Sequence, residues 1–190
     1  MSSSNNNLRF SIIAVMILLA AFSRVLPHMP NFSPLGAIGL FGAAYFKKRW
    51  QAFLIPISAT WLSDLYINNV IYAKDYPTFT WFEGGVLWIY GSYLLIALAG
   101  IFMLNKVTAP TVIGGALTSS AIFFIVTNFA CWPGSTEYMQ NFSGLLTCYA
   151  AGIPFLKGTL IGDLWFAGVL FGSFALMERT IPALKMAENI

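Results

Sequence analysis

Long apolar runs separated by short polar breaks decide what this chain can fold into. A helix needs about 20 apolar residues to cross the hydrocarbon core of a bilayer, and most of the runs approach that length. Six spans are predicted, at residues 8–26, 35–46, 50–72, 85–104, 110–130 and 159–177. Hydrophobic residues make up 58% of the chain and charged residues only 9%, whereas an average soluble domain is about 25% charged. The sequence therefore predicts an all-α membrane protein, a bundle of six transmembrane helices.

The remaining segments leave no room for a large soluble domain. We expect a disordered tail over residues 1–7, a single membrane domain over residues 8–178 and a cytoplasmic tail over residues 179–190. The apolar segment 142–156 contains two glycines and a proline. Because it is too short to cross a bilayer easily, we expect it to form a re-entrant or interfacial segment before the last helix. This organisation excludes a fused ATPase.

Lysine and arginine residues are concentrated in alternate loops. If the N-terminus is inside and the chain crosses six times, the inner side receives seven of the ten, namely Arg9, Lys47, Lys48, Arg49, Lys106, Arg179 and Lys185. The outer side receives Lys74 and Lys157, and Arg24 lies within a span. Cytoplasmic loops carry an excess of basic residues. We therefore expect a multi-pass protein of the inner membrane with both termini in the cytoplasm.

Three charged residues interrupt the predicted spans: Arg24, Asp64 and Asp163. An ionised side chain at the centre of a membrane helix costs about 2.5 kcal/mol or more. Such residues therefore face a protein interior or a watery cavity, and they usually have a partner. Counting along the spans at about 1.5 Å per residue puts all three towards the outer side. We predict that all three bind substrate.

Helical spacing adds polar and aromatic residues to this outer layer. Residues four apart share a face of a helix, which gives three stripes: Thr60, Trp61, Asp64 and Asn68; Ser120, Phe124, Asn128 and Cys131; and Thr159 with Asp163. The loop 28–34 holds two prolines and small polar residues, so we expect it to close over the site. Ligand pockets combine apolar and aromatic walls with a few polar groups. The further substrate-binding candidates are His28, Asn31, Trp61, Asn128 and Trp132.

The same residues also have possible structural roles. Arg24 can pair with either aspartate to hold helices together, or it can extend to the outer interface. Tryptophans near the membrane boundary suit an aromatic belt. Cys131 and Cys148 can be ordinary buried thiols, or they can form one disulfide on the outer side.

Motifs of enzymes and of nucleic-acid-binding proteins are absent from the sequence. The chain has one histidine and no GxSxG, HExxH, P-loop or glycine-rich dinucleotide turn. We therefore expect no enzymatic activity, and we predict no catalytic residue, metal ligand or cofactor. No basic stripe interleaved with aromatic residues is present to follow nucleic acid. The expected partners are the lipid bilayer and a small-molecule substrate.

Two segments carry a resemblance to known proteins. Residues 31–43 (NFSPLGAIGLFGA) and 158–166 (GTLIGDLWF) resemble an uncharacterised family of small bacterial integral membrane proteins described as candidate transport proteins. The resemblance extends from about Arg24 to Met177, through NFACW at 128–132 and LLTCY at 145–149. It implies a transport protein of a bacterial inner membrane.

More distantly, the size, the six spans and the outer polar layer resemble the substrate-binding S components of energy-coupling-factor (ECF) vitamin transporters. In those proteins the first loop and the outer ends of later helices enclose a vitamin, which here corresponds to residues 28–34 and to spans three to six. The resemblance implies an energising transporter module as a partner. The Ala-x-x-x-Ala pattern that faces that partner is incomplete here, because Ala14 is followed at the fourth position by Leu18. A transporter that works alone, or with another partner, therefore also fits the sequence.

We expect this protein to capture a small, vitamin-like organic molecule from the outer side of the membrane and to take part in its uptake. Two other functions fit the sequence. One is a membrane scaffold or assembly subunit, in which the charges serve only helix pairing. The other is an intramembrane enzyme that uses Asp64 and Asp163.

Overall fold

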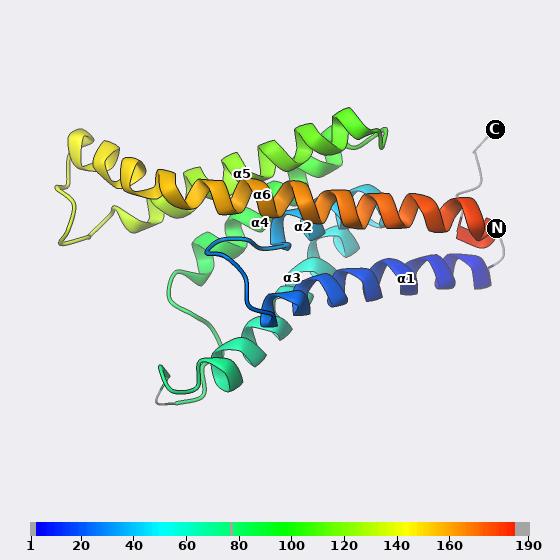
Figure 1. Ribbon diagram of the computed structural model, residues 1–190, viewed down its shortest axis with the longest axis horizontal. Helices are drawn as coiled ribbons and strands as arrows, with labels where there is room; N and C mark the ends of the chain where they lie inside the picture. The colour runs from blue at the N-terminus through cyan, green and yellow to red at the C-terminus, as the bar shows by residue number, and fades with distance from the viewer. Residues whose placement is uncertain (1–2, 77, 185–190) are drawn as a thin grey trace.

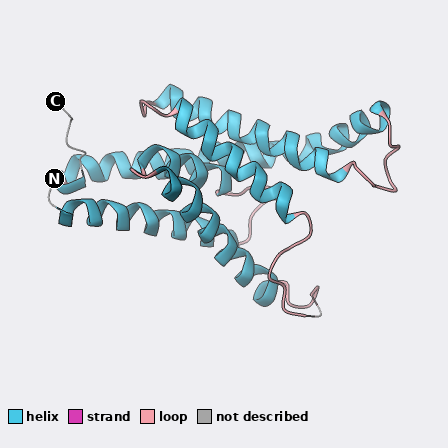
Figure 2. Ribbon diagram, turned by 180° about the vertical axis from the view of Figure 1, so that it is seen from behind, coloured by secondary structure: helices cyan, strands magenta, loops and turns pink. Residues whose placement is uncertain are grey.

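The computed structural model describes residues 3–76 and 78–184, and over those residues it contains helices and no strand (Figures 1 and 2). The six α-helices are α1 (Ser3–Phe22), α2 (Leu35–Tyr45), α3 (Arg49–Tyr66), α4 (Val86–Met103), α5 (Ala109–Cys131) and α6 (Phe142–Thr180). Three short helical turns accompany them: η1 (Ser23–Val25), the π-helix η2 (Ile67–Ile71) and η3 (Pro182–Leu184). The predicted all-α class is confirmed.

Four helices are long and apolar enough to cross a membrane: Asn5–Val25, Val86–Met103, Ala109–Cys131 and Phe142–Thr180. Their length and composition indicate a membrane protein. Helix α2 has the same apolar character but only 11 residues, and α3 is less apolar. The six predicted crossings therefore stay a prediction, although the six helices begin and end within a few residues of most of the predicted bounds.

Two segments differ from the prediction. Residues 3–7, expected in a disordered tail, form the first turns of α1; residues 1–2 and 185–190 lie outside the described residues. The segment 142–156, expected to be re-entrant or interfacial, is the first part of the continuous helix α6. No separate segment precedes the last helix, because Pro154 is accommodated inside α6; the interfacial position of residues 142–156 stays a prediction. At about 1.5 Å per residue, a 39-residue helix exceeds the roughly 30 Å hydrocarbon core.

Helix α2 is the centre of the bundle. Nine of its 11 residues are buried, and α1, α3, α4, α5 and α6 all pack against it. Such burial requires small residues at the contacts. A Cβ atom at Gly42 would lie 2.9 Å from Pro56 Cγ of α3, and one at Gly100 of α4 would lie 2.8 Å from Ala43 Cβ. Gly42 and Gly100 therefore allow α2 to pack closely against α3 and α4.

A buried arginine joins the two ends of the chain. Arg9 of α1 is only 6% exposed, and its Nη1 lies 2.6 Å from Glu178 Oε1 of α6 and donates a hydrogen bond to the Leu184 carbonyl oxygen. Its guanidinium also lies 5.6 Å from the ring centroid of Tyr45 and 5.1 Å from that of Phe174. The start of α1 and the end of α6 consequently lie at the same end of the molecule (Figure 1).

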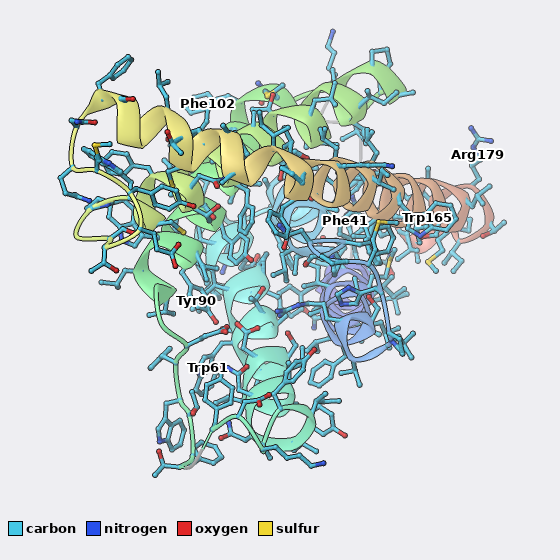
Figure 3. All side chains as sticks on the ribbon, turned by 60° about the vertical axis from the view of Figure 1, so that its left-hand side comes forward. Phe41, Trp61, Tyr90, Phe102, Trp165 and Arg179 are labelled. Atoms are coloured by element: carbon cyan, nitrogen blue, oxygen red, sulfur yellow. The ribbon has the colours of Figure 1, made fainter. Side chains whose placement is uncertain are left out.

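The aromatic partners of Arg9 extend inwards from this ion pair. Tyr45 lies 4.4 Å from Phe174, ring centroid to ring centroid, and Phe41 packs edge-on against both Phe171 and Phe174. Figure 3 shows Phe41 in the interior beneath α6, whereas Arg179 projects away from the bundle. From the sequence, Arg9 was predicted only to be one of several basic residues on the inner side of the membrane. In the structure it holds the two ends of the chain together.

The Arg9–Glu178 pair predicts a specific stability pattern. Glu178→Leu strands a buried guanidinium, and breaking a buried pair in this way costs about 3–5 kcal/mol. The double variant Arg9→Met, Glu178→Leu should recover most of that loss. Thermal unfolding of the detergent-solubilised protein measures both effects. The neighbouring exposed residue supplies the control, Arg179→Leu, which should change stability little. Equal losses in Glu178→Leu and Arg179→Leu would contradict the assigned role.

Candidate functional site

One cavity of about 320 Å³ lies where α2 begins, between the loop 26–34 and the loop that joins η2 to α4. Eight elements or loops contribute polar or aromatic side chains to it. These residues are Arg24, His28, Asn31, Ser33, Asp64, Asn68, Tyr72, Tyr76, Glu83, Tyr93, Ser119, Phe123, Thr159 and Asp163. Leu35, Gly36, Ile67, Ile89 and Ile96 complete the wall. All three intramembrane charges predicted from the sequence therefore border a single space.

Arg24 and Asp64 form an ion pair at the wall of the cavity. Arg24 Nη1 lies 2.5 Å from Asp64 Oδ1 and donates to Ser63 Oγ at 2.9 Å. The second carboxylate oxygen of Asp64 accepts a hydrogen bond from the Tyr90 hydroxyl at 2.9 Å. About a fifth of each charged side chain is exposed, 19% for Arg24 and 21% for Asp64. The pair thus joins η1, α3 and α4 while one side of it faces the cavity.

Asp163 of α6 lies against the first turn of α2. Its Oδ2 accepts a hydrogen bond from Ser120 Oγ of α5 at 2.7 Å, and the Ala37 backbone N–H points towards the carboxylate. The contact requires Gly36, because a Cβ atom there would overlap both Asp163 Oδ1 and Ser119 Oγ. The first N–H groups of a helix lack partners within the helix and attract negative charge. Asp163, 2% exposed, supplies that charge.

The loop 26–34 crosses α6 at two glycines and then enters α2. A Cβ atom at Gly158 would overlap the Pro30 carbonyl oxygen, and one at Gly162 would lie 2.8 Å from Ser33 N. Asn31 has φ 59°, the left-handed region, which asparagine tolerates better than most residues. Asn31 therefore has a conformational role in the loop in addition to its position at the cavity.

Two consecutive asparagines in the π-helix η2 have different roles. Asn68 lines the cavity and is 5% exposed. Asn69 instead fixes the loop that follows η2: its amide nitrogen donates to the Leu65 and Thr80 carbonyl oxygens at 2.9 Å, and its amide oxygen accepts from Thr80 N at 2.7 Å. Single π-turns inside α-helices often occur at functional sites.

The same outer loop carries the rim of the cavity. The Tyr76 hydroxyl donates to Glu83 Oε1 at 3.2 Å. Partial burial and the nearby Glu83 carboxylate raise the pKa of the Tyr76 hydroxyl above its usual 10.0. Tyr76 is therefore a neutral hydrogen-bond donor at physiological pH, and Glu83 is its acceptor.

Five of the eight predicted binding residues meet at the cavity, namely Arg24, His28, Asn31, Asp64 and Asp163, and three do not. Trp61 Nε1 donates to the Trp81 carbonyl oxygen at 3.2 Å, in an aromatic group outside the cavity. Trp132 Nε1 donates to the Met139 carbonyl oxygen at 2.9 Å, within the α5–α6 connection. Asn128 lies between α5 and α6, where a Cβ atom at Gly152 would overlap its Oδ1.

The tyrosines of the cavity were not predicted from the sequence, and α5 lines the cavity with Ser119 and Phe123, beside the predicted stripe. Tyr93 and Phe123 line the cavity with their rings stacked 6.0 Å apart, and Ser119 lies beside Asp163. The residues of α5 that line the cavity each lie one position before a residue of the predicted stripe, Ser120 to Asn128. The cysteines at its end and on α6 are free thiols, Cys131 exposed and Cys148 buried.

Gly36 provides a direct test of the Asp163 contact. Gly36→Ala should destabilise the protein by about 1–3 kcal/mol, the usual cost of overpacking a core, because its methyl group displaces Asp163 or Ser119. Gly39→Ala, on the same helix, is the matched control: its Cβ meets only Ile96 Cγ2, at 3.4 Å. There the higher helix propensity of alanine should leave stability equal or slightly raised. Equal melting temperatures for the two variants would contradict the packing described here.

The cavity lining contains hydrogen-bonding groups, aromatic rings and charged side chains. In the part of the chain that the structure describes, no group of three His, Cys, Asp or Glu side chains could hold a metal ion. The cavity instead offers hydrogen-bond donors and acceptors, aromatic faces and partly exposed charges, which together can orient a small molecule.

Comparison with known proteins identifies a family but no activity. No match is found among curated proteins or among solved structures. Residues 4–184 match the model of a family described as a family of unknown function, DUF6580. This match spans nearly the whole chain, so the protein belongs to the DUF6580 family.

Proposed function

We propose that this protein binds a small, vitamin-like organic solute in the cavity, from the outer side of the inner membrane, and takes part in its uptake. The observation that carries the proposal is the cavity itself. Its volume of about 320 Å³ is at the lower end of the range of small-molecule pockets, about 300–1,000 Å³. Its lining combines aromatic walls with polar groups from distant parts of the chain.

The hydrogen-bond partners of the two aspartates support a binding role over a catalytic one. Asp64 is engaged by Arg24 and Tyr90, and Asp163 is engaged by Ser120 and the start of α2. A general acid or base needs a proton-transfer path to substrate, whereas these carboxylates already accept hydrogen bonds from the protein. We accordingly assign them to architecture and to binding.

The proposed orientation follows from charge. The Arg9 end carries Lys47, Lys48 and Lys106 in loops and Arg49 at the start of α3, whereas the loops at the cavity end carry Lys74. Lys157, predicted on the outer side, lies within α6. Because cytoplasmic loops are enriched in basic residues, the cavity faces outwards and both termini are cytoplasmic. The given sequence has no P-loop, so we do not assign ATP hydrolysis to its described helices. The resemblance to S components supports a separate energising module as the partner.

Native mass spectrometry of gently purified protein tests solute binding. Substitutions at Asn31 test whether its side-chain amide takes part in that binding. A retained small molecule is expected on the wild-type protein. Asn31→Gly keeps the left-handed backbone that this position needs but removes the amide from the cavity, so it should lower occupancy without lowering the melting temperature of the ligand-free protein.

Asn31→Ala is the companion variant for this experiment. It removes the same amide but strains the backbone, so it should lower both occupancy and melting temperature. Wild-type occupancy in Asn31→Gly would remove the amide from the binding site. A wild-type protein that retains nothing would count against the proposed function.

Cysteine labelling tests the orientation. In a background with Cys131 and Cys148 replaced by alanine, single cysteines at Asp75 and Lys106 report opposite ends of the bundle. An impermeant thiol reagent should label the Asp75→Cys protein in intact cells, after permeabilisation of any outer membrane. It should label the Lys106→Cys protein only after lysis. The reverse pattern would overturn the orientation.

A further inference from the structure

The charges that line the cavity are unbalanced. Asp64, Glu83 and Asp163 contribute three carboxyl groups, whereas Arg24 is the only lysine or arginine, and His28 the only histidine, among the described lining residues. Arg24 is already paired with Asp64 at 2.5 Å, so these two charges compensate each other. Asp163 is compensated by its hydrogen bond from Ser120 and by the positive end of the α2 helix dipole.

Glu83 remains without a cation. Its carboxylate is exposed at the rim and accepts a hydrogen bond from the neutral Tyr76 hydroxyl at 3.2 Å. Within residues 3–76 and 78–184, the ion pairs are Arg9–Glu178 and Arg24–Asp64, and neither involves Glu83. An uncompensated carboxylate at the mouth of a partly closed cavity attracts positive charge and repels negative charge.

One buried polar side chain indicates that the cavity can hold a ligand. Ser119 is 1% exposed, and its Oγ lies beside the Asp163 carboxylate but has no hydrogen-bond partner of normal geometry in the described part of the chain. Buried polar groups normally have partners, and leaving one without a partner is costly. Ser119 lines the cavity together with Asn68, which is 5% exposed, and a bound molecule can supply the missing partner of Ser119.

The aromatic lining is of the kind that binds cations. Tyr72, Tyr76, Tyr93 and Phe123 line the cavity, and the rings of Tyr93 and Phe123 are stacked on each other. The face of an aromatic ring carries negative charge density and attracts an ammonium or amidinium group, more strongly where water is excluded. Aromatic faces combined with an excess of carboxylates therefore favour a cationic ligand over an anionic one.

We propose that the solute of this cavity is a small organic cation, such as a protonated amine or amidine carried on a flat or apolar body. Its positive charge lies near Glu83 and the tyrosines, and its hydrogen-bonding groups reach Ser119 and Asn68. This inference rests on the proposed solute-binding function and adds the charge class of the solute.

The charge of the retained molecule is the first test. Its mass and formula, from denatured wild-type protein, should correspond to a compound that is cationic at pH 7. A neutral or anionic retained molecule would overturn the cation inference and leave solute binding intact.

If no molecule is retained, three probes of similar shape decide the question: tryptamine as the cation, indole-3-acetamide as the neutral analogue and indole-3-acetate as the anion. At low salt, tryptamine should raise the melting temperature most. Preference for the acetamide or the acetate would overturn the inference. If the wild-type protein retains no molecule and no probe shifts its melting temperature, both the cation inference and the proposed function would be overturned.

Glu83→Gln tests where the positive charge lies. The variant keeps the shape of the side chain, and because Glu83 is exposed the ligand-free melting temperature should not change. Affinity for the cation should fall about tenfold or more, as expected when a hydrogen bond to a charged group loses its charge. Glu137→Gln, an exposed acid of the loop 132–141 outside the cavity, should bind as the wild type does. Undiminished binding by Glu83→Gln, or an equal loss in Glu137→Gln, would overturn the assignment.

Discussion

The rest of the structure depends on burying α2, a short glycine-rich helix, in the middle of the bundle. An apolar interior offers no water to the first N–H groups of a helix, which have no partner within the helix. Ser33 Oγ accepts from Leu35 N at 3.4 Å, and Asp163 of α6 provides a carboxylate beside Ala37. This contact between Asp163 and the start of α2 offsets the negative charge of Asp163 and gives the first N–H groups of α2 an acceptor. Gly36 makes it possible, because any larger residue would occupy the space of the carboxylate.

Arg24, Asp64 and Asp163 therefore stabilise contacts between helices. The parts of these side chains that remain accessible also border the cavity. Inserting an arginine or an aspartate into a membrane helix is costly, and each of the three charges has a protein partner that offsets this cost. Arg24 and Asp64 still expose about a fifth of their side chains. Helix pairing and solute binding, which the sequence presented as alternatives, are compatible in this geometry.

Hydropathy predicted most helix bounds well because length and composition are local properties of the chain. What it could not predict depends on neighbours. A proline usually interrupts a helix, yet Pro154 lies inside α6. Periodicity showed that Ser120, Phe124 and Asn128 share a face, but not which helix that face contacts. In the structure Asn128 meets Gly152 of α6, which turns Ser119 and Phe123 to the cavity. Arg9 was missed for the same reason, since Tyr45 and Phe174 are distant in sequence.

Both ends of α2 are fixed by side chains from α6, which ties the cavity to the opposite end of the bundle. Leu35 and Gly36 border the cavity at one end, and Tyr45 lies under Arg9 at the other, about 15 Å away at the rise of an α-helix. Packed interiors are stiff, and the glycine contacts with α3 and α4 leave α2 little room to bend. The loop 26–34 leads directly into Leu35. Helix α2 therefore links this loop at the cavity to the aromatic group that supports the Arg9–Glu178 pair.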